Sequence, residues 1–285
     1  MESDATYVCF SASIPQNQLF NLKTACTAMK RLSLFLLAAF SATALYAQKQ
    51  VSAREVFQAI DKHQSVQYDG VVVTGDLDFT ELSNRKIKKE KGWEEIKTTV
   101  EVPVVFRNCT FKGDVIAYKR LEENGSRTKI FNIEVNGDGG TTYSADFREN
   151  AVFENCTFEN GSEFKYSTFS KVANFAGSKF AEQANFKYAR FRQDALYTNI
   201  RFEDYANFKY ADFSRRADFQ EVRFRDYADF KYAEFEEKVN FAGSRFQRNA
   251  DFKYADFNAG ASFDKADFDG SVDFKYSNGK RYVSR

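Results

Sequence analysis

The chain has 285 residues, with 41 lysines and arginines against 40 aspartates and glutamates and a formal net charge of +1. This balance leaves no basic excess, so it does not support a nucleic-acid-binding protein, whose affinity depends on releasing counterions from phosphates. The sequence holds one histidine and shows no metal-ligand spacing, phosphate loop or nucleophile–base pattern. We therefore expect no cofactor and no enzyme activity.

The first recognisable element is a secretory signal over residues 29–47. It begins with Met-Lys-Arg, continues with a short apolar stretch, and ends in small residues that allow cleavage after Ala47. The apolar stretch is too short for an ordinary membrane span. We expect a bacterial protein exported to the periplasm or the medium, with a buried helix of a cytosolic protein as the alternative. Residues 1–28 show no pattern and are interpreted as a mis-annotated or disordered extension.

A short capping helix is predicted within residues 48–70. Ser52-Ala-Arg-Glu55 fits a capping box, and the next apolar residues have helical spacing, which predicts a helix over about 52–63. The only histidine, His63, follows this helix and is expected to be solvated. Such a helix would cover the open end of a repeat array, as a terminal unit must.

Two insertions interrupt the segment that follows. Residues 71–117 contain the first inward–outward alternation, but the stretch 83–98, which includes Trp93, is charged and breaks the period. Residues 118–144 form a second insertion, with apolar alternation at 130–135 and a glycine-rich turn, and we expect a hairpin there.

A 22-residue repeat occupies residues 145–276. The tripeptide Phe-Lys-Tyr occurs six times, from Phe164 to Phe274, always 22 residues apart. Aromatic residues recur at alternating steps of five and six, and a small residue stands two positions before nearly every one. Small, polar and aromatic residues in succession predict short strands with one buried face. Four such segments per unit predict a four-sided coil, and successive coils stack as parallel strands about 4.8 Å apart.

These residues resemble a known family. Ala-Asn-Phe-Lys-Tyr-Ala-Arg-Phe (184–191) and Ala-Asp-Phe-Lys-Tyr-Ala-Asp-Phe (250–257) look like pentapeptide repeats. The resemblance covers 145–276 continuously and 71–117 more weakly, and it implies an all-β fold, a right-handed quadrilateral parallel β-helix. The chain departs from the family pattern by using phenylalanine almost throughout and by adding a sixth residue on every second side.

The resemblance says less about function, because family members share a scaffold more than an activity. Some resemble DNA and present an acidic rod to DNA gyrase. Removal of residues 1–47 would leave 38 basic and 38 acidic side chains, and a neutral, exported rod has neither the charge nor the compartment for that role. DNA mimicry is therefore the least favoured of the alternatives.

Two cysteines are predicted to stack. Phe111 and Phe158 are 47 residues apart, which is one unit plus a 25-residue insertion, so Cys109 should lie beside Cys156 on the next coil. A separation near 4.8 Å permits a disulfide in an oxidising compartment. Two buried, reduced thiols are the favoured alternative, because stacked side chains often point in the same direction.

The outward-facing columns are the functional candidates. Tyrosine is enriched at interfaces, so we predict a surface for a protein or glycan partner, with structural stacking of the columns as the alternative. The candidate residues are Tyr166, Tyr188, Tyr210, Tyr232, Tyr254, Tyr276, Lys187, Lys209, Lys231, Lys253 and Trp93. Lys179, Arg201, Arg223 and Arg245 line a different side. Asp229, Asp251 and Asp273 are expected to point outward beside the lysines and to neutralise them.

The predicted function is a non-catalytic, exported structural or protein-interaction scaffold. A carbohydrate-binding or carbohydrate-active β-helix is the alternative, because some β-helical proteins degrade polysaccharides. The tail 277–285 has no recognisable capping helix, so the last coil would expose strand edges. A homodimer through the C-terminal coil would cover them. We expect no membrane span once the signal is removed.

Overall fold

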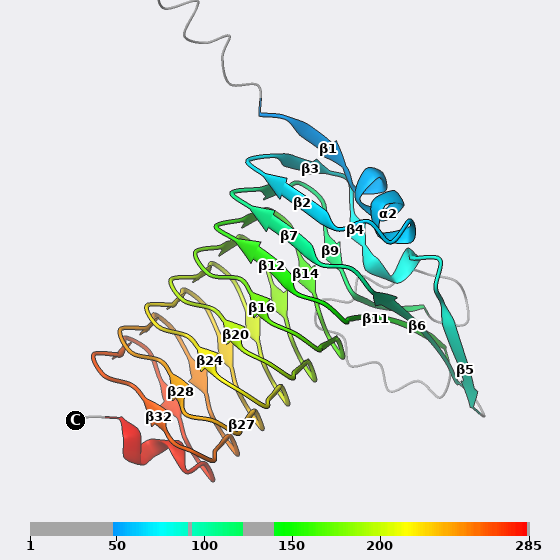
Figure 1. Ribbon diagram of the computed structural model, residues 1–285. Coiled ribbons are helices and arrows are strands. Elements are labelled where there is room, and N and C mark those ends of the chain that lie inside the picture. The colour runs from blue at the N-terminus through cyan, green and yellow to red at the C-terminus, as the bar shows by residue number, and fades with distance from the viewer. Residues whose placement is uncertain (1–47, 91–92, 122–139, 284–285) are drawn as a thin grey trace, which may run out of the picture. The chain divides into compact units, whose positions relative to one another are not determined.

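The structure, a computed structural model, describes residues 48–90, 93–121 and 140–283. The predicted signal (29–47), the stretch 1–28 and the apolar alternation at 130–135 lie outside the described residues. These described residues form a parallel β-helix of four sheets, here numbered 1 to 4 in the order in which each coil visits them (Figure 1). This confirms the all-β, four-sided fold.

Sheet 1 has eight strands and sheet 2 has nine, all parallel. Sheet 1 contains, in order, β2 (Val66–Asp69), β7 (Val104–Arg107), β12 (Ala151–Glu154), β16 (Ala173–Asn174), β20 (Ala195–Leu196), β24 (Ala217–Asp218), β28 (Val239–Asn240) and β32 (Ala261–Ser262). Sheet 2 contains β1 (Gln50–Ser52), β3 (Val72–Thr74), β8 (Thr110–Phe111), β13 (Thr157–Phe158), β17 (Lys179–Phe180), β21 (Arg201–Phe202), β25 (Arg223–Phe224), β29 (Arg245–Phe246) and β33 (Asp267–Phe268).

Sheets 3 and 4 complete each coil. Sheet 3 contains β4 (Leu77–Asp78), β9 (Val115–Ile116), β14 (Ser162–Glu163), β18 (Ala184–Asn185), β22 (Ala206–Asn207), β26 (Ala228–Asp229), β30 (Ala250–Asp251) and β34 (Val272–Asp273). Sheet 4 contains β5 (Lys86–Glu90), β6 (Trp93–Val100), β11 (Thr141–Phe147), β15 (Thr168–Phe169), β19 (Arg190–Phe191), β23 (Asp212–Phe213), β27 (Glu234–Phe235) and β31 (Asp256–Phe257), with β10 (Tyr118–Leu121) paired to β11. The antiparallel pairs among the described strands are β5–β6 and β10–β11.

Phenylalanine rings fill the interior as continuous stacks. Each ring lies on the equivalent ring one coil away, as in Phe169 on Phe191, with centroids 5.0 Å apart and planes within 1°. Rings from opposite sheets also meet edge to face, as Phe208, after β22 of sheet 3, meets Phe219, after β24 of sheet 1, at 5.3 Å. Both arrangements suit the charge distribution of an aromatic ring, and such pairs add about 0.5–1.5 kcal/mol beyond the area they bury. The stacking therefore explains why nearly every large inward residue of the repeat is phenylalanine.

The N-terminal end is closed by the predicted helix. Helix α2 (Ala53–Asp61) begins after Ser52, whose hydroxyl accepts the backbone N–H of Glu55 while the Glu55 carboxylate accepts that of Ser52. Val56 and Ile60 are buried against the first coil. The prediction placed residues 48–70 as cap and lead-in, but β1 and β2 are already strands of sheets 2 and 1. β1 pairs with β3 at a spacing of 22 residues, whereas β2 pairs with β7 across 38 residues because the first insertion intervenes.

The C-terminal end is also partly covered, which corrects the expectation of an uncapped tail. A short 3₁₀ helix, η2 (Gly279–Tyr282), folds back on the last coils. The Asn278 side chain accepts the backbone N–H of Phe257 at 3.0 Å. A Cβ at Gly279 would lie 2.4 Å from the Phe257 ring, so only glycine allows this approach. One turn of 3₁₀ helix has no hydrophobic period from which it could be predicted.

Candidate interaction surface

The six predicted tyrosines occupy one corner of the solenoid, between sheets 3 and 4. Each is the third residue of a tight turn, as at Tyr188, where the N–H of Ala189 donates to the carbonyl of Phe186 at 3.0 Å. All six have φ between 56° and 61°. This left-handed conformation costs a residue with a Cβ about 1–2 kcal/mol. The opposite corner mostly uses asparagine or glycine for the same conformation, so tyrosine stands here against its local preference.

Ring stacking offsets that cost. Consecutive rings of this tyrosine column lie 4.7–4.8 Å apart, as between Tyr188 and Tyr210 or between Tyr210 and Tyr232. Lysine ammonium groups stand over the rings, with Nζ of Lys187 5.3 Å from the ring centroid of Tyr188 and Nζ of Lys209 5.4 Å from that of Tyr210. Aromatic pairs and cation–π contacts each contribute about 0.5–1.5 kcal/mol. The column therefore stabilises the corner that it strains.

Stacking decides which part of each tyrosine a partner can reach. Neighbouring rings cover the faces along the column, so ring edges and hydroxyls remain accessible. Tyr276, at the C-terminal end, is 65% exposed. A sugar ring binds an aromatic residue through a free face, so the column offers few places for that contact. It suits instead a partner that accepts hydrogen bonds from the tyrosine hydroxyls and carries negative charge opposite the lysines.

The column is longer than predicted, because Tyr118 of β10 stacks on Tyr166 with centroids 5.4 Å apart. Counting residues across the second insertion aligns Tyr118 with Lys165, and the ammonium of Lys165 does lie 4.9 Å from the Tyr118 ring. The Tyr118 ring contacts the tyrosine column with its plane inclined by 54° to that of Tyr166. No repeat count predicts a side-chain tilt, so this member was missed.

The aspartates of sheet 3 differ from the prediction. Asp229 and Asp251 are buried, and each Oδ1 accepts the backbone N–H two residues on. The hydroxyls of Tyr205 and Tyr227 cover them, donating to Asp229 at 3.0 Å and to Asp251 at 3.2 Å. The expected pairing with lysine occurs at Lys253, which contacts Asp251 and Asp273. The main role of these carboxylates is therefore to hold the turn.

The same column begins with Glu163, which stacks beside Asn185. Its carboxylate accepts both bonds of the Asn185 amide group, at 2.9 and 3.2 Å. Burial raises the pKa of Glu163 to about 8. A carboxyl group in this state carries a proton at neutral pH.

The two insertions form a sheet extension, here called the wing. It comprises β5, residues 93–97 of β6, β10 and residues 141–144 of β11, in the order β5-β6-β11-β10. In Figure 1, β5 and the start of β6 extend past the coils. Ile87 is 58% exposed and Trp93 is 40% exposed, and Nζ of Lys88 lies 5.5 Å from the Trp93 ring. The wing thus joins exposed apolar side chains to a basic strand.

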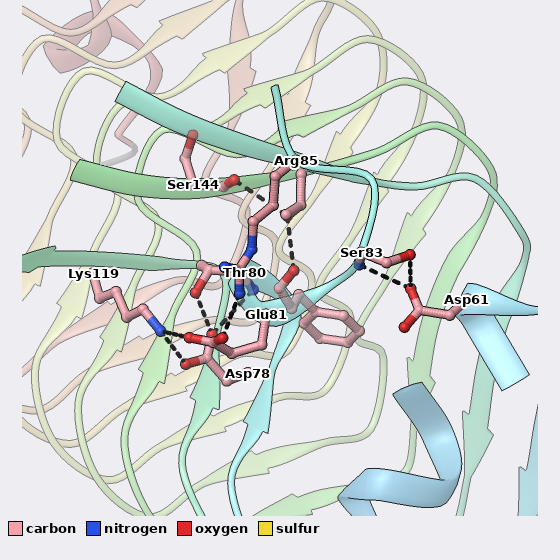
Figure 2. Close-up of polar contacts among 10 residues, drawn as sticks. Asp61, Asp78, Thr80, Glu81, Ser83, Arg85, Lys119 and Ser144 are labelled. Carbon is pink, nitrogen blue, oxygen red and sulfur yellow. Dashed lines mark hydrogen bonds and ion pairs between the residues drawn. The ribbon is translucent and has the colours of Figure 1, made fainter. Parts of the chain in front are cut away.

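An ion cluster with a buried lysine and a buried aspartate fastens the wing to the first coil (Figure 2). Lys119 of β10 is 8% exposed, and its ammonium pairs with Asp78 at 2.8 Å and with Glu81. Asp78 also accepts the N–H and hydroxyl of Thr80, at 3.0 and 2.6 Å. Thr80 and Glu81 belong to the 3₁₀ helix η1 (Phe79–Glu81). Hydrogen bonding from Lys119 lowers the pKa of Glu81.

The predicted cysteine stacking is present. Thr110 pairs with Thr157 and Phe111 with Phe158, which places Cys109 beside Cys156. Both are buried, free thiols. Each sulfur lies near backbone carbonyls, that of Cys109 3.0 Å from Arg107 and that of Cys156 3.4 Å from Glu154. Interaction between the two thiols lowers the pKa of Cys109 and raises that of Cys156.

Two further observations bear on chemistry. The described residues contain no group of three or more histidine, cysteine or acidic side chains able to hold a metal ion. No helix within the described ranges is both long and apolar enough to cross a membrane. His63 is exposed and has Nδ1 3.9 Å from Glu101.

Comparison with known proteins gave one match. The family model described as pentapeptide repeats (9 copies) matches residues 143–190, 164–211, 186–234 and 230–278. No curated protein and no solved structure matched the chain. The matched ranges overlap into a single continuous stretch, the part of the chain with the unbroken 22-residue period.

Proposed function

Residues 143–278 of this chain belong to the pentapeptide-repeat family, and on that premise we propose that the protein is an exported, non-catalytic scaffold that binds a protein partner at the wing. Export is supported by the basic, apolar and small-residue segments in succession over 29–47. The regular coils supply a rigid support, and the adjoining tyrosine column supplies hydroxyls and lysines beside the wing.

The observation that carries the proposal is the exposure of Ile87 and Trp93 on the wing. Buried aromatic anchors surrounded by polar side chains dominate the energy of most interfaces, and tryptophan is the residue most enriched among them. Here the tryptophan lies at the start of β6, next to the lysines of β5. The regular coils present similar outward residues at each level. The wing, by contrast, is a non-repeating surface, on which a partner can be recognised specifically.

The anchoring of the wing strengthens this proposal. An ion cluster of the buried Lys119 and Asp78 with the half-exposed Glu81 connects β10 to the first coil. The wing is also continuous with the solenoid, because β6 and β11 begin in the wing and end in sheet 4. A surface held in one conformation before binding loses less entropy on association than a flexible one.

The test is a pull-down from an envelope extract with the full chain as bait. Replacement of Ile87 and Trp93 by serine should abolish capture of a partner that binds the wild type. It should leave the solenoid folded, because neither side chain belongs to the core. Tyr276→Ser is the matched control, since it removes an exposed aromatic residue from the other end. A partner captured equally by all three proteins would contradict the proposal.

The tyrosine column needs its own variant. Replacing Tyr188 and Tyr232 by serine removes ring contacts on both sides of each position. If the column only supports the corner, this variant should unfold at lower temperature and any folded fraction should still bind. A variant that remains folded but fails to bind would place the column within the interface.

A further inference from the structure

Opposite faces of the solenoid carry charged columns of opposite sign. The outward residues of sheet 2 are Lys179, Arg201, Arg223 and Arg245, one per coil. Those of sheet 4 are Arg190 on the first of the same coils and Asp212, Glu234 and Asp256 on the last three. Each coil visits sheets 1, 2, 3 and 4 in turn, so sheets 2 and 4 lie on opposite sides. One molecule therefore presents a basic and an acidic column back to back.

Neighbouring members of each column carry like charges. Parallel pairing places Arg201 directly beside Arg223, and Asp212 directly beside Glu234, about 4.8 Å apart. Like charges at directly opposite positions of a sheet are destabilising. Within the described ranges neither Arg201 nor Arg223 forms an ion pair, whereas other members of the columns have partners in the same molecule: Lys179 pairs with Glu203, Arg245 with Asp267 and Asp212 with Arg192. Burial raises the pKa of Glu234, and the neighbouring carboxylates add to the shift.

We propose that a second copy of this chain covers these columns, with sheet 2 of one molecule packed side by side against sheet 4 of the next. Arg201 and Asp212 belong to the same coil, as do Arg223 with Glu234 and Arg245 with Asp256. Sideways translation of a copy, without rotation, therefore brings three basic residues level with three acidic ones. A second copy fits both columns, because its own columns carry the opposite charges at the same spacing from coil to coil. A different protein would need charges at that same spacing to fit even one column.

The geometry determines the kind of assembly. A contact between two different faces of the same protein does not close on itself after one step, so copies add in open rows. Sheet 2 has nine strands, which gives a face roughly 40 Å long. The face is only as wide as one side of the four-sided coil, so the interface would be narrow. Its ion pairs would therefore be exposed to solvent. Such pairs are weak and screened by salt, so association should be concentration-dependent and should weaken as salt rises.

Sedimentation velocity of the full chain over a concentration series tests the proposal. The wild type should form species larger than a monomer at about 0.01 M salt and return to monomer near 1 M salt, where the Debye length falls from about 30 Å to about 3 Å. Reversing Arg201 and Arg223 to glutamate should weaken association by more than about tenfold, because acidic faces then meet. Reversing Asp212 and Glu234 to arginine should do the same.

Restoration separates this contact from damage to the fold. A chain carrying all four reversals, or an equimolar mixture of the two double variants, should associate as the wild type does. Lys171→Glu with Lys238→Glu is the control, since both lysines are exposed, lie outside the two columns and change the net charge equally. The proposal is overturned if the wild type stays monomeric at low salt. It is also overturned if the control weakens association as much as the column variants, or if the fourfold reversal fails to restore it.

Discussion

The fully buried tyrosine Tyr197 gives the sharpest prediction about stability. Tyr197 lies in the inner column of sheet 1, where the rings above and below it are Phe175 at 5.3 Å and Phe219 at 4.8 Å. Its side chain is fully buried, and its hydroxyl has no hydrogen-bond partner among the described residues. Tyr197→Phe should therefore stabilise the protein.

The magnitude follows from the cost of burying a polar group. A hydroxyl transferred from water into a protein interior without a hydrogen bond costs about 1–3 kcal/mol. Loss of the oxygen leaves the ring stack intact and removes few contacts, so most of that cost should be recovered. For a protein of this size, about 1 kcal/mol corresponds to roughly 2–4 °C in melting temperature. We expect Tyr197→Phe to melt about 2–8 °C higher.

Thermal unfolding followed by circular dichroism measures this shift. Phe219→Tyr is the matched control, because it places the same hydroxyl one coil away in the same column and should lower the melting temperature by a similar amount. The reasoning is refuted if Tyr197→Phe melts lower than the wild type, since the hydroxyl would then have a favourable partner in the core.

Three other predictions concern the non-repeating residues. Lys119→Met should lower the free energy of unfolding by about 3–5 kcal/mol, measured by urea denaturation, because it leaves Asp78 buried without its cation; an unchanged midpoint would contradict this. Because the pKa of Glu163 is raised to about 8 from 4.5, the folded state binds more protons, so stability should fall as pH rises from about 4.5 to 8. Glu163→Gln should flatten that slope, and equal slopes would show that another group is responsible. Intact mass should be the same with and without reductant if Cys109 and Cys156 stay free thiols, whereas a two-dalton difference would show a disulfide.

The regular part of the fold follows from sequence because each repeat states the same local pattern many times. The four-sided coil, the stacking of Cys109 on Cys156 and the capping box at Ser52 all depend on residues close in sequence or on an exact count. Where the period holds, one unit predicts the next.

The remaining features depend on contacts between coils. Asp229 has the sequence position of an outward residue, but Tyr205, 24 residues earlier, covers it. The tilt of Tyr118 and the folding back of η2 likewise depend on side chains that meet only after the coils have formed. Alternation predicts the face on which a residue stands, and it does not predict what another coil places over that face.

The 22-residue spacing also makes the length of the solenoid a countable quantity. Every regular coil bonds to the coil before it and the coil after it through the same partners, as Tyr188 N–H bonds to Lys209 and Tyr210 N–H to Lys231. Removing or duplicating one whole unit would therefore preserve the backbone hydrogen bonds at each remaining junction. Such a change would move the C-terminal end by one strand spacing, about 4.8 Å. Duplication or loss of whole repeat units in the gene would thus change the length of the solenoid in fixed increments without altering how its core packs.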